Sequence, residues 1–329
     1  VDSNEKAFET ASKILAADVD VIFCNMVTYA TSSVFAPIIQ QVNKPVVLIP
    51  IDFSDYSKKA CLIGFDFAKQ MGGRVILLHS YVEMTYAMAM MPFSNEDTGD
   101  KHAEQKALKR MNDFEIQIKN DISNGILPGV KFTCRIEEGV PEVTIIECAK
   151  RENATLIVMG TRGKSKKEEE LIGSVTAEVL DEGKFTVFSV PEGMEARKMS
   201  ELKNVAFFSN FIQQDLLSFD IFARLFKNRK LNITIIPIET QKNDDKTKKY
   251  LDQLVQYCQS HYSDFNFKAE ILSPDNYAKD FDEYVKAQNI DLMLIPNKKR
   301  NIFSRLFSPS VAHRMVFHSD VPLLVVPIS

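Results

Sequence analysis

Residues 156–163 read Leu-Ile-Val-Met-Gly-Thr-Arg-Gly, and after a gap of nine residues, 164–172, positions 173–176 read Gly-Ser-Val-Thr. The first four residues are apolar without alternation, which is typical of a strand covered on both faces of a parallel sheet. The glycines that follow allow a sharp turn, and an apolar helical pattern begins after residue 173. This stretch therefore predicts a strand, loop and helix unit of an α/β fold.

The same spacing predicts a phosphate-binding loop. Because Gly160 and Gly163 lack a Cβ atom, the backbone there could approach a ligand closely. Gly173 and Ser174 stand at the predicted helix start, where free N–H groups and the positive end of the helix dipole favour phosphate. Arg162 lies where a polyphosphate would pass. Either glycine pair alone could be a plain tight turn, but the combined spacing after a buried strand favours the phosphate loop.

Similar units occur on both sides of this stretch. Continuous apolar runs at 46–51, 75–78 and 186–190 predict further central strands, and the strictly alternating run at 130–136 predicts an edge strand. An apolar stripe at helical spacing predicts a helix over 57–70 that ends at the following glycines. The order of these elements favours a parallel sheet.

The second half of the chain repeats the pattern of the first. The alternating strand recurs at 265–271, and the last two strands recur at 291–295 and 321–327. A polar stretch separates the two copies, as is typical of a surface linker. We therefore predict a domain at 45–192, a linker at 193–203 and a second domain at 204–329, with an additional α/β segment at 1–44.

A second candidate feature is Asp52, within Pro-Ile-Asp-Phe-Ser at 50–54. An Asp just past the carboxyl end of a parallel strand points into the crevice where open α/β sheets bind ligands. It could instead cap the following helix, a role that Ser54 or Asp55 could also fill. The backbone after the next strand, which ends in Leu-Leu-His-Ser at 77–80, could line the same crevice.

These motifs resemble those of the universal stress protein family, in which the first strand ends in Pro-x-Asp-x-Ser, the second in Leu-His, and nucleotide-binding members carry Gly-x2-Gly-x9-Gly-Ser/Thr. The match covers about residues 44–192. It implies a Rossmann-like, five-stranded open parallel sheet in each of two tandem copies. It also implies ATP binding, with Asp52 at the adenosine, the backbone near Ser80 at the adenine edge, and the glycines with Ser174 at ribose and phosphates. The predicted nucleotide-binding set is Asp52, Ser80, Gly160, Arg162, Gly163, Gly173, Ser174, Val175 and Thr176.

The second copy keeps the spacing of the motif but not its residues. Pro-Asn-Lys-Lys at 296–299 and Pro-Ser at 309–310 replace the glycines, and Asn210 takes the place of Asp52. Pro309 lacks the N–H group that a phosphate would need. We therefore predict a single nucleotide site, in the first copy, and a structural or interaction role for the second.

Residues 1–50 resemble part of the N-terminal domain of L-arabinose isomerase-type sugar isomerases. The resemblance implies a segment of separate origin joined near Lys44 and Pro45. The metal of that family is held by carboxylates and histidines of later domains, which nothing else in this chain resembles. We therefore assign no activity to the segment, and a sugar isomerase is the most distant of the functions considered.

Composition excludes several classes of function. With 40 Lys and Arg against 44 Asp and Glu, the net charge of −4 gives no support for non-specific binding to nucleic acid or anionic membrane. Five cysteines are odd in number and contain no Cys-x-x-Cys pair, which favours reduced thiols in a cytoplasm. No run approaches 18 apolar residues, and the scattered histidines do not indicate a metal site.

The sequence thus predicts a stress-related regulatory protein that binds ATP, with or without Mg²⁺, as a homodimer or an intramolecular domain pair with an unidentified protein partner. Two alternatives remain open. One is a slow ATP hydrolase or phosphotransferase that uses the same site, although no activating base is recognisable. The other is a scaffold that binds no nucleotide.

Overall fold

The computed structural model describes residues 44–83, 103–161, 174–191, 194, 201–209, 213–237, 245–271, 284–298 and 321–328. The chain divides into two compact units, Val1–Pro45 and Val46–Ser329, and everything below concerns the second unit. The additional N-terminal segment predicted at 1–44 lies almost entirely outside the described residues.

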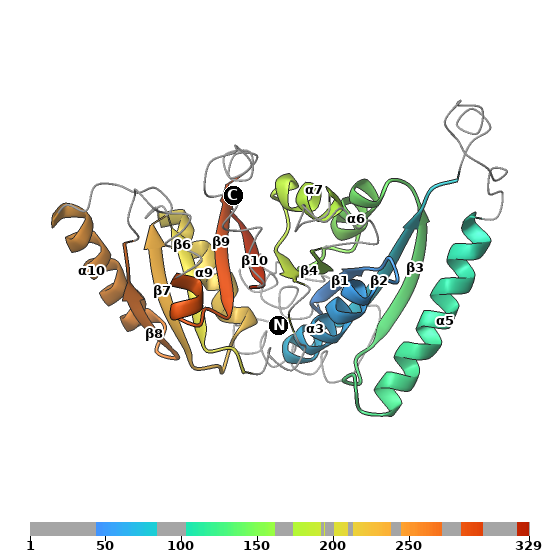
Figure 1. Cartoon of the computed structure of the whole chain (residues 1–329), viewed down its shortest axis with the longest axis horizontal. Helices are drawn as coiled ribbons and strands as arrows, with labels where there is room; N and C mark the ends of the chain where they lie inside the picture. Colours follow the sequence, from blue (N-terminus) through green and yellow to red (C-terminus); the bar gives the residue numbers. More distant parts are fainter. Residues whose placement is uncertain are drawn as a thin grey trace, which may run out of the picture. The chain divides into compact units, whose positions relative to one another are not determined.

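Strands and helices alternate through the first half of this unit, as predicted, and through the second half as far as the strand Phe265–Ala269; the described elements that follow are two further strands (Figure 1). The first half contains β1 (Val46–Pro50), α3 (Asp55–Met71), β2 (Arg74–Tyr81), α5 (Ala103–Ser123), β3 (Phe132–Glu138), α6 (Pro141–Arg151), β4 (Leu156–Gly160), α7 (Ser174–Glu182) and β5 (Val187–Val190). The second half contains β6 (Asn204–Ser209), α9 (Gln213–Leu225), β7 (Leu231–Pro237), α10 (Asp245–His261), β8 (Phe265–Ala269), β9 (Leu292–Lys298) and β10 (Leu323–Ile328).

The ten strands form one sheet in the order β3-β2-β1-β4-β5-β10-β9-β6-β7-β8. Within each half the described strands pair in parallel, so each half contributes the predicted five-stranded parallel sheet. The two halves meet where β5 pairs with β10 in the antiparallel direction, with Leu323 opposite Ser189. The chain is therefore an intramolecular pair of α/β copies.

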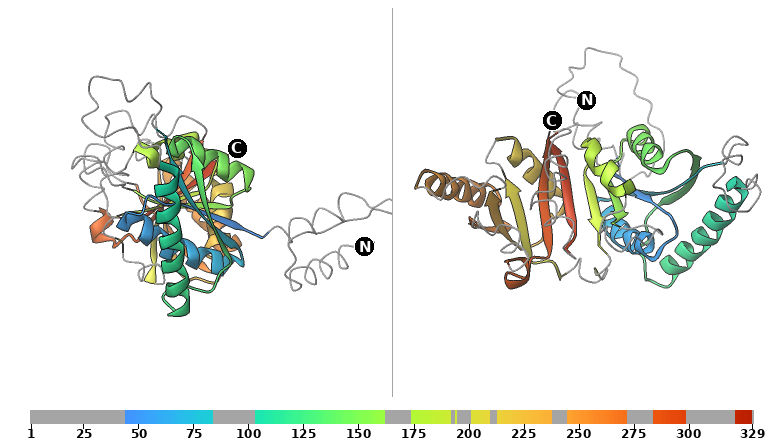
Figure 2. Two further views of the ribbon diagram at one scale, coloured as in Figure 1. Left: turned by 90° about the vertical axis from the view of Figure 1, so that its right-hand side faces the viewer. Right: turned by 45° about the horizontal axis from the view of Figure 1, so that its top comes forward.

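The two alternating strands, β3 and β8, lie at the two edges of the sheet, as their sequence pattern predicts. The central strands are buried along almost their whole length. Helix α5 runs alongside β3 (Figure 2). Apolar strand residues with no polar face need cover on both sides, and the helices supply it.

Two apolar cores flank the sheet. The larger contains residues of α3, α5, α9 and α10, and the smaller contains residues of α6 and α7. Both cores include side chains from both halves. In the larger core the Phe67 ring of α3 lies 5.2 Å from the ring of Phe188 and 5.7 Å from that of Phe226. The junction between the halves is thus packed as well as hydrogen-bonded.

Candidate functional site

The order of the strands places the predicted site. From β1 the chain proceeds to β2 and β3 on one side of the sheet, then crosses to β4 and β5 on the other side. In open α/β sheets, ligands bind in the crevice at such a switch point, outside the carboxyl ends of the strands. Asp52 follows β1, Ser80 lies near the end of β2, and Gly160 is the last residue of β4. Three predicted site residues therefore come from neighbouring strand ends.

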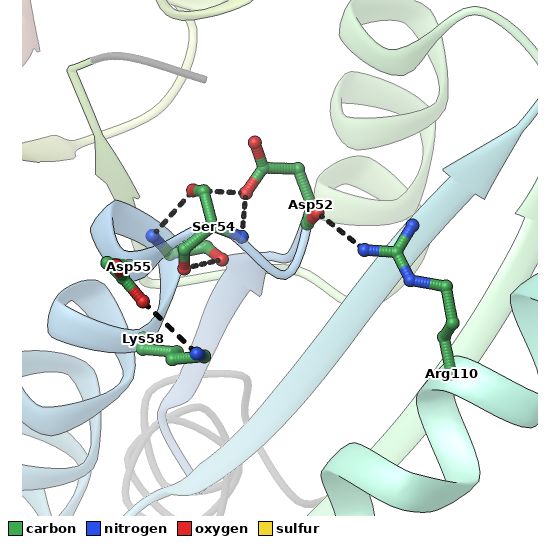
Figure 3. A network of polar contacts seen from close by, with 6 residues as sticks. Asp52, Ser54, Asp55, Lys58 and Arg110 are labelled. Atoms are coloured by element: carbon green, nitrogen blue, oxygen red, sulfur yellow. Dashed lines mark hydrogen bonds and ion pairs between the residues drawn. The ribbon is translucent and has the colours of Figure 1, made fainter. Parts of the chain in front are cut away.

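Asp52 is held by the loop that follows β1 (Figure 3). Its Oδ1 accepts hydrogen bonds from the Ser54 backbone N–H at 2.9 Å and from the Ser54 hydroxyl at 2.5 Å. Among the residues that the structure describes, none donates a hydrogen bond to Oδ2. One oxygen of the carboxylate is thus fixed, and the other is available to a ligand.

The sequence allows Asp52, Ser54 or Asp55 as the cap of helix α3, and in the structure the cap is Ser54. Its hydroxyl accepts from the Ser57 N–H at 3.3 Å while donating to Asp52. Helix α3 consequently begins at Asp55, two residues before the start predicted from its apolar stripe, and it ends at Met71 beside the expected glycines. Asp52 therefore does not serve as the cap.

Phe53, between these two residues, has a left-handed backbone with a φ of 63°. This region is strained for a bulky side chain. The ring of Phe53 lies 4.6 Å from that of His79 and 5.8 Å from that of Phe114, and the Arg110 guanidinium lies 4.2 Å above it. We call these four residues the Phe53 cluster.

The Phe53 cluster supports the backbone of Asp52 from the side of α5. Arg110 donates from Nη2 to the Asp52 carbonyl at 3.4 Å (Figure 3). His79 donates from Nδ1 to the Ile51 carbonyl at 2.6 Å. Because a carbonyl oxygen only accepts, Nδ1 of His79 carries a proton. Sequence reasoning did not identify Phe53 or Arg110, since no residue pattern signals a phenylalanine at positive φ.

Gly160 and Thr176 connect β4 with the start of α7. The Thr176 hydroxyl, buried, donates to the Gly160 carbonyl at 2.9 Å. A Cβ atom on Gly160 would lie 2.8 Å from Cβ of Tyr56 in the first turn of α3. The need for glycine here thus has a packing cause, besides the close approach of a ligand that the sequence suggested.

The remaining predicted residues are less fully described. Arg162, Gly163 and Gly173 lie outside the described residues. Ser174 begins α7, and Val175 is half-buried against the smaller core. The phosphate part of the predicted site therefore stays a prediction.

The second half differs at the corresponding place. The Ser209 hydroxyl at the end of β6 donates to buried Asp215 in α9 at 2.8 Å. Asn297, within the altered motif, is buried in β9. Asn210 and the pair at 309–310 lie outside the described residues.

The described cysteines are not activated nucleophiles. Burial raises the pKa of Cys134 to about 12, with a further contribution from Glu115, and burial raises the pKa of Cys258 to about 11. Burial also raises the pKa of Cys61 and of Cys148. A thiol reacts as its thiolate, so these four groups are inert at neutral pH.

The described residues contain no group of three or more His, Cys, Asp or Glu side chains arranged to hold a metal ion. In the same part of the chain, no helix combines the length and the apolar character that crossing a membrane requires.

Comparisons with known proteins agree with this architecture. The model of the universal stress protein family matches residues 45–191 and 262–327. A universal stress protein of Methanocaldococcus jannaschii is 31% identical over 136 residues, which are 41% of this chain and 74% of the relative. Another, from Thermus aquaticus, is 28% identical over 145 residues, 44% of this chain and 96% of the relative.

A solved structure covers both halves. The crystal structure of a universal stress protein from Archaeoglobus fulgidus superposes with a TM-score of 0.64, over 86% of this chain and 98% of that one, at 19% identity. At this identity the likeness concerns the fold, and it extends over the tandem arrangement.

Proposed function

Because the chain belongs to the universal stress protein family, we propose that its first half, residues 45–192, binds ATP at the carboxyl ends of β1, β2 and β4. The second half, 204–329, then serves as a structural or interaction copy. In this proposal the protein is a stress-related regulator that responds to adenine nucleotide.

The observation that supports the proposal is that both hydrogen bonds that described residues donate to the Asp52 carboxylate go to Oδ1. Ser54 is the cap of α3, and Asp52 uses only Oδ1 to hold Ser54, which leaves Oδ2 for a ligand. Its second oxygen stands beside the switch point of the sheet, where ribose hydroxyls or a base amino group are suitable donors. Charge-assisted hydrogen bonds of this kind are among the stronger ones in proteins.

The proposed contacts to the phosphates and to adenine come from α7, from the strand end near Ser80 and from the glycine loop. The first N–H groups of α7 have no partner within the helix and favour a phosphate. Thr176 uses its hydroxyl proton to hold this helix start against Gly160, which makes it a support of the site. The backbone near Ser80 would meet the adenine edge, and Arg162, Gly163 and Gly173 would complete the phosphate loop.

Isothermal titration of the full chain with ATP, with and without Mg²⁺, tests the proposal. Asp52→Asn keeps the shape of the side chain but removes its charge, and we expect it to weaken ATP binding about tenfold, in line with a charged hydrogen bond. Gly163→Leu combined with Gly173→Leu should abolish binding. Asp55→Asn is the matched control, because Asp55 is exposed and, within the described part of the chain, forms an ion pair only with Lys58, at 3.1 Å.

Undiminished ATP binding in Asp52→Asn and in the double glycine variant would overturn the site. A wild-type chain that binds no adenine nucleotide would favour the scaffold. Release of phosphate that exceeds a protein-free control and disappears in the glycine variant would instead promote the slow ATP hydrolase.

A cytoplasmic location is part of the proposal. Its support is chemical: Cys61, Cys134, Cys148 and Cys258 are free thiols in the structure. Reducing compartments keep thiols in this form.

A further inference from the structure

Asn297 in the second half reaches into the first. It occupies the second position of the altered motif, where the first half has Thr161. The residue is 2% exposed, and its Nδ2 donates to the carbonyl of Leu180 in α7 at 2.9 Å. The two residues are 117 positions apart, so this buried hydrogen bond joins the halves away from the β5–β10 pair.

The bond lies at the carboxyl end of α7. The last carbonyls of a helix have no partner within it and need one from elsewhere. The Leu180 carbonyl accepts from the Gly183 N–H at 3.2 Å and from Asn297. Gly183 has a φ of 61°, and a Cβ atom there would lie 3.2 Å from Nδ2 of Asn297. One group from each half thus closes this helix end.

The other end of α7 belongs to the proposed nucleotide site. The helix has nine residues, so its two ends are only about 14 Å apart. Thr176 ties its first turn to β4, and Asn297 ties its last turn to β9. Helices this short are marginal without tertiary contacts. The direction of the free N–H groups at Ser174 therefore depends on both attachments.

We propose that Asn297 is a positioning residue for the nucleotide site of the first half. The second half lacks the glycines of the motif, and the end of its strand β9 holds the helix that would bind phosphate. This inference rests on the proposed function. It gives the altered motif a role in ATP binding without a second nucleotide.

Two variants of the full chain remove the contact. Asn297→Asp keeps the shape but places an acceptor against the Leu180 carbonyl, and Asn297→Ala removes the group. Ser189→Ala is the matched control, because the Ser189 hydroxyl accepts a buried hydrogen bond from the Leu323 N–H at 3.3 Å across the same junction. That bond lies in the strand pair and not at the end of α7.

Isothermal titration with ATP and hydrogen exchange of residues 180–186 are the two readouts. We expect both Asn297 variants to bind ATP about fivefold more weakly and to exchange faster in this segment, which is the size of coupling seen through packed elements. The ATP affinity of Ser189→Ala should stay within about twofold of that of the wild type, even if its urea midpoint falls as much as those of the Asn297 variants. In the wild type, saturating ATP should slow exchange at 180–186, since coupling between sites is reciprocal.

The outcomes separate this inference from the proposed function. Wild-type protein and Asn297 variants that bind ATP equally well would overturn the positioning role and leave the site standing. An equal loss of affinity in Ser189→Ala would also overturn it, because the effect would then be one of general stability. Should the wild type bind no ATP at all, the proposed function fails, and the inference with it.

Discussion

Phe53 concentrates the local strain of the candidate site in one residue. A left-handed backbone costs an L-residue about 1–2 kcal/mol, and here it turns the chain between Asp52 and Ser54. The cost is offset by the ring contacts of the Phe53 cluster, above all the guanidinium of Arg110 at 4.2 Å. The residue beside the Asp52 carboxylate is therefore held by contacts on α5 and β2.

Two substitutions of Phe53 distinguish the effect of its strained backbone from the effect of its ring contacts. Both Phe53→Ala and Phe53→Gly lose the ring contacts, but only glycine relieves the strain. We expect Phe53→Gly to be more stable than Phe53→Ala by about 1 kcal/mol in urea denaturation. Glu147, exposed on helix α6, is the control position, where alanine should exceed glycine by about 1 kcal/mol. An alanine variant at position 53 as stable as the glycine variant would contradict the account of strain.

The sequence predicts this part of the site only to a point. Asp52 can be placed at a strand end because apolar runs and turn residues are local signals. The conformation of Phe53 depends on side chains from α5 and β2, which no local pattern reveals. The spacing of the motif explains Gly160 by the approach of a ligand, whereas the closeness of Tyr56 to Gly160 arises only from the packing of α3 on β4.

At the scale of the elements, helix α6 is joined to the sheet by ion pairs at its carboxyl end. Its C-cap residue, Glu152, accepts from Arg74 of β2 and from Arg135 of β3, each at 2.8 Å, and Arg151 lies 3.7 Å away. One carboxylate thus joins α6 to two strands. The hydrogen bond from Arg74, together with the charges of all three arginines, lowers the pKa of Glu152 although burial opposes the shift.

This anchor predicts a pH dependence of stability. A carboxylate whose pKa is lowered by folding stabilises the protein above its unfolded pKa, about 4.3, and the contribution is lost as the pH falls through the folded pKa. We expect Glu152→Gln to be less stable than the wild type by about 1 kcal/mol at neutral pH. The two unfolding free energies should converge once the pH has fallen through the folded pKa of Glu152, which lies below its unfolded value.

Urea denaturation at a series of pH values measures both curves. Glu147→Gln on the same helix is the control, because Glu147 is exposed and forms no ion pair with any described residue. It should follow the wild type throughout. A gap between wild type and Glu152→Gln that persists unchanged into acid would refute the role of the carboxylate.

The elements themselves were largely predictable. The continuous apolar runs predict the central strands and the alternating runs predict the edge strands, in agreement with the sheet. The reason is that a strand buried on both faces is apolar throughout, whereas a strand buried on one face alternates. The start of α3 differed by two residues, since the Ser54 cap acts through a hydrogen bond that an apolar stripe does not register.

At the scale of the whole molecule, the two copies form a single sheet. The internal repeat predicts two similar units, but the antiparallel pair between β5 and β10 joins segments more than 130 residues apart. Nothing local in either strand selects its partner. The aromatic contacts of Phe67 cross the same junction, so both cores continue from one half into the other.

The packing of the halves can be measured through one ring pair. Phe67 of α3 and Phe226, just after α9, meet edge to face with centroids 5.7 Å apart. In a double-mutant cycle with Phe67→Leu and Phe226→Leu, we expect a coupling of about 0.5–1.5 kcal/mol in the free energy of unfolding. Because the chain has no tryptophan, far-UV circular dichroism in urea is the suitable measurement.

A second cycle supplies the control. Phe265 belongs to the aromatic group of the second half and contacts Phe219 and Phe222, and its ring makes no described contact with that of Phe67. Phe67→Leu and Phe265→Leu should therefore add within about 0.5 kcal/mol. Additivity in both cycles would mean that the Phe67–Phe226 ring pair does not couple the two halves. Coupling confined to the Phe67–Phe226 pair would establish that the second copy stabilises the first through its core, independently of any nucleotide.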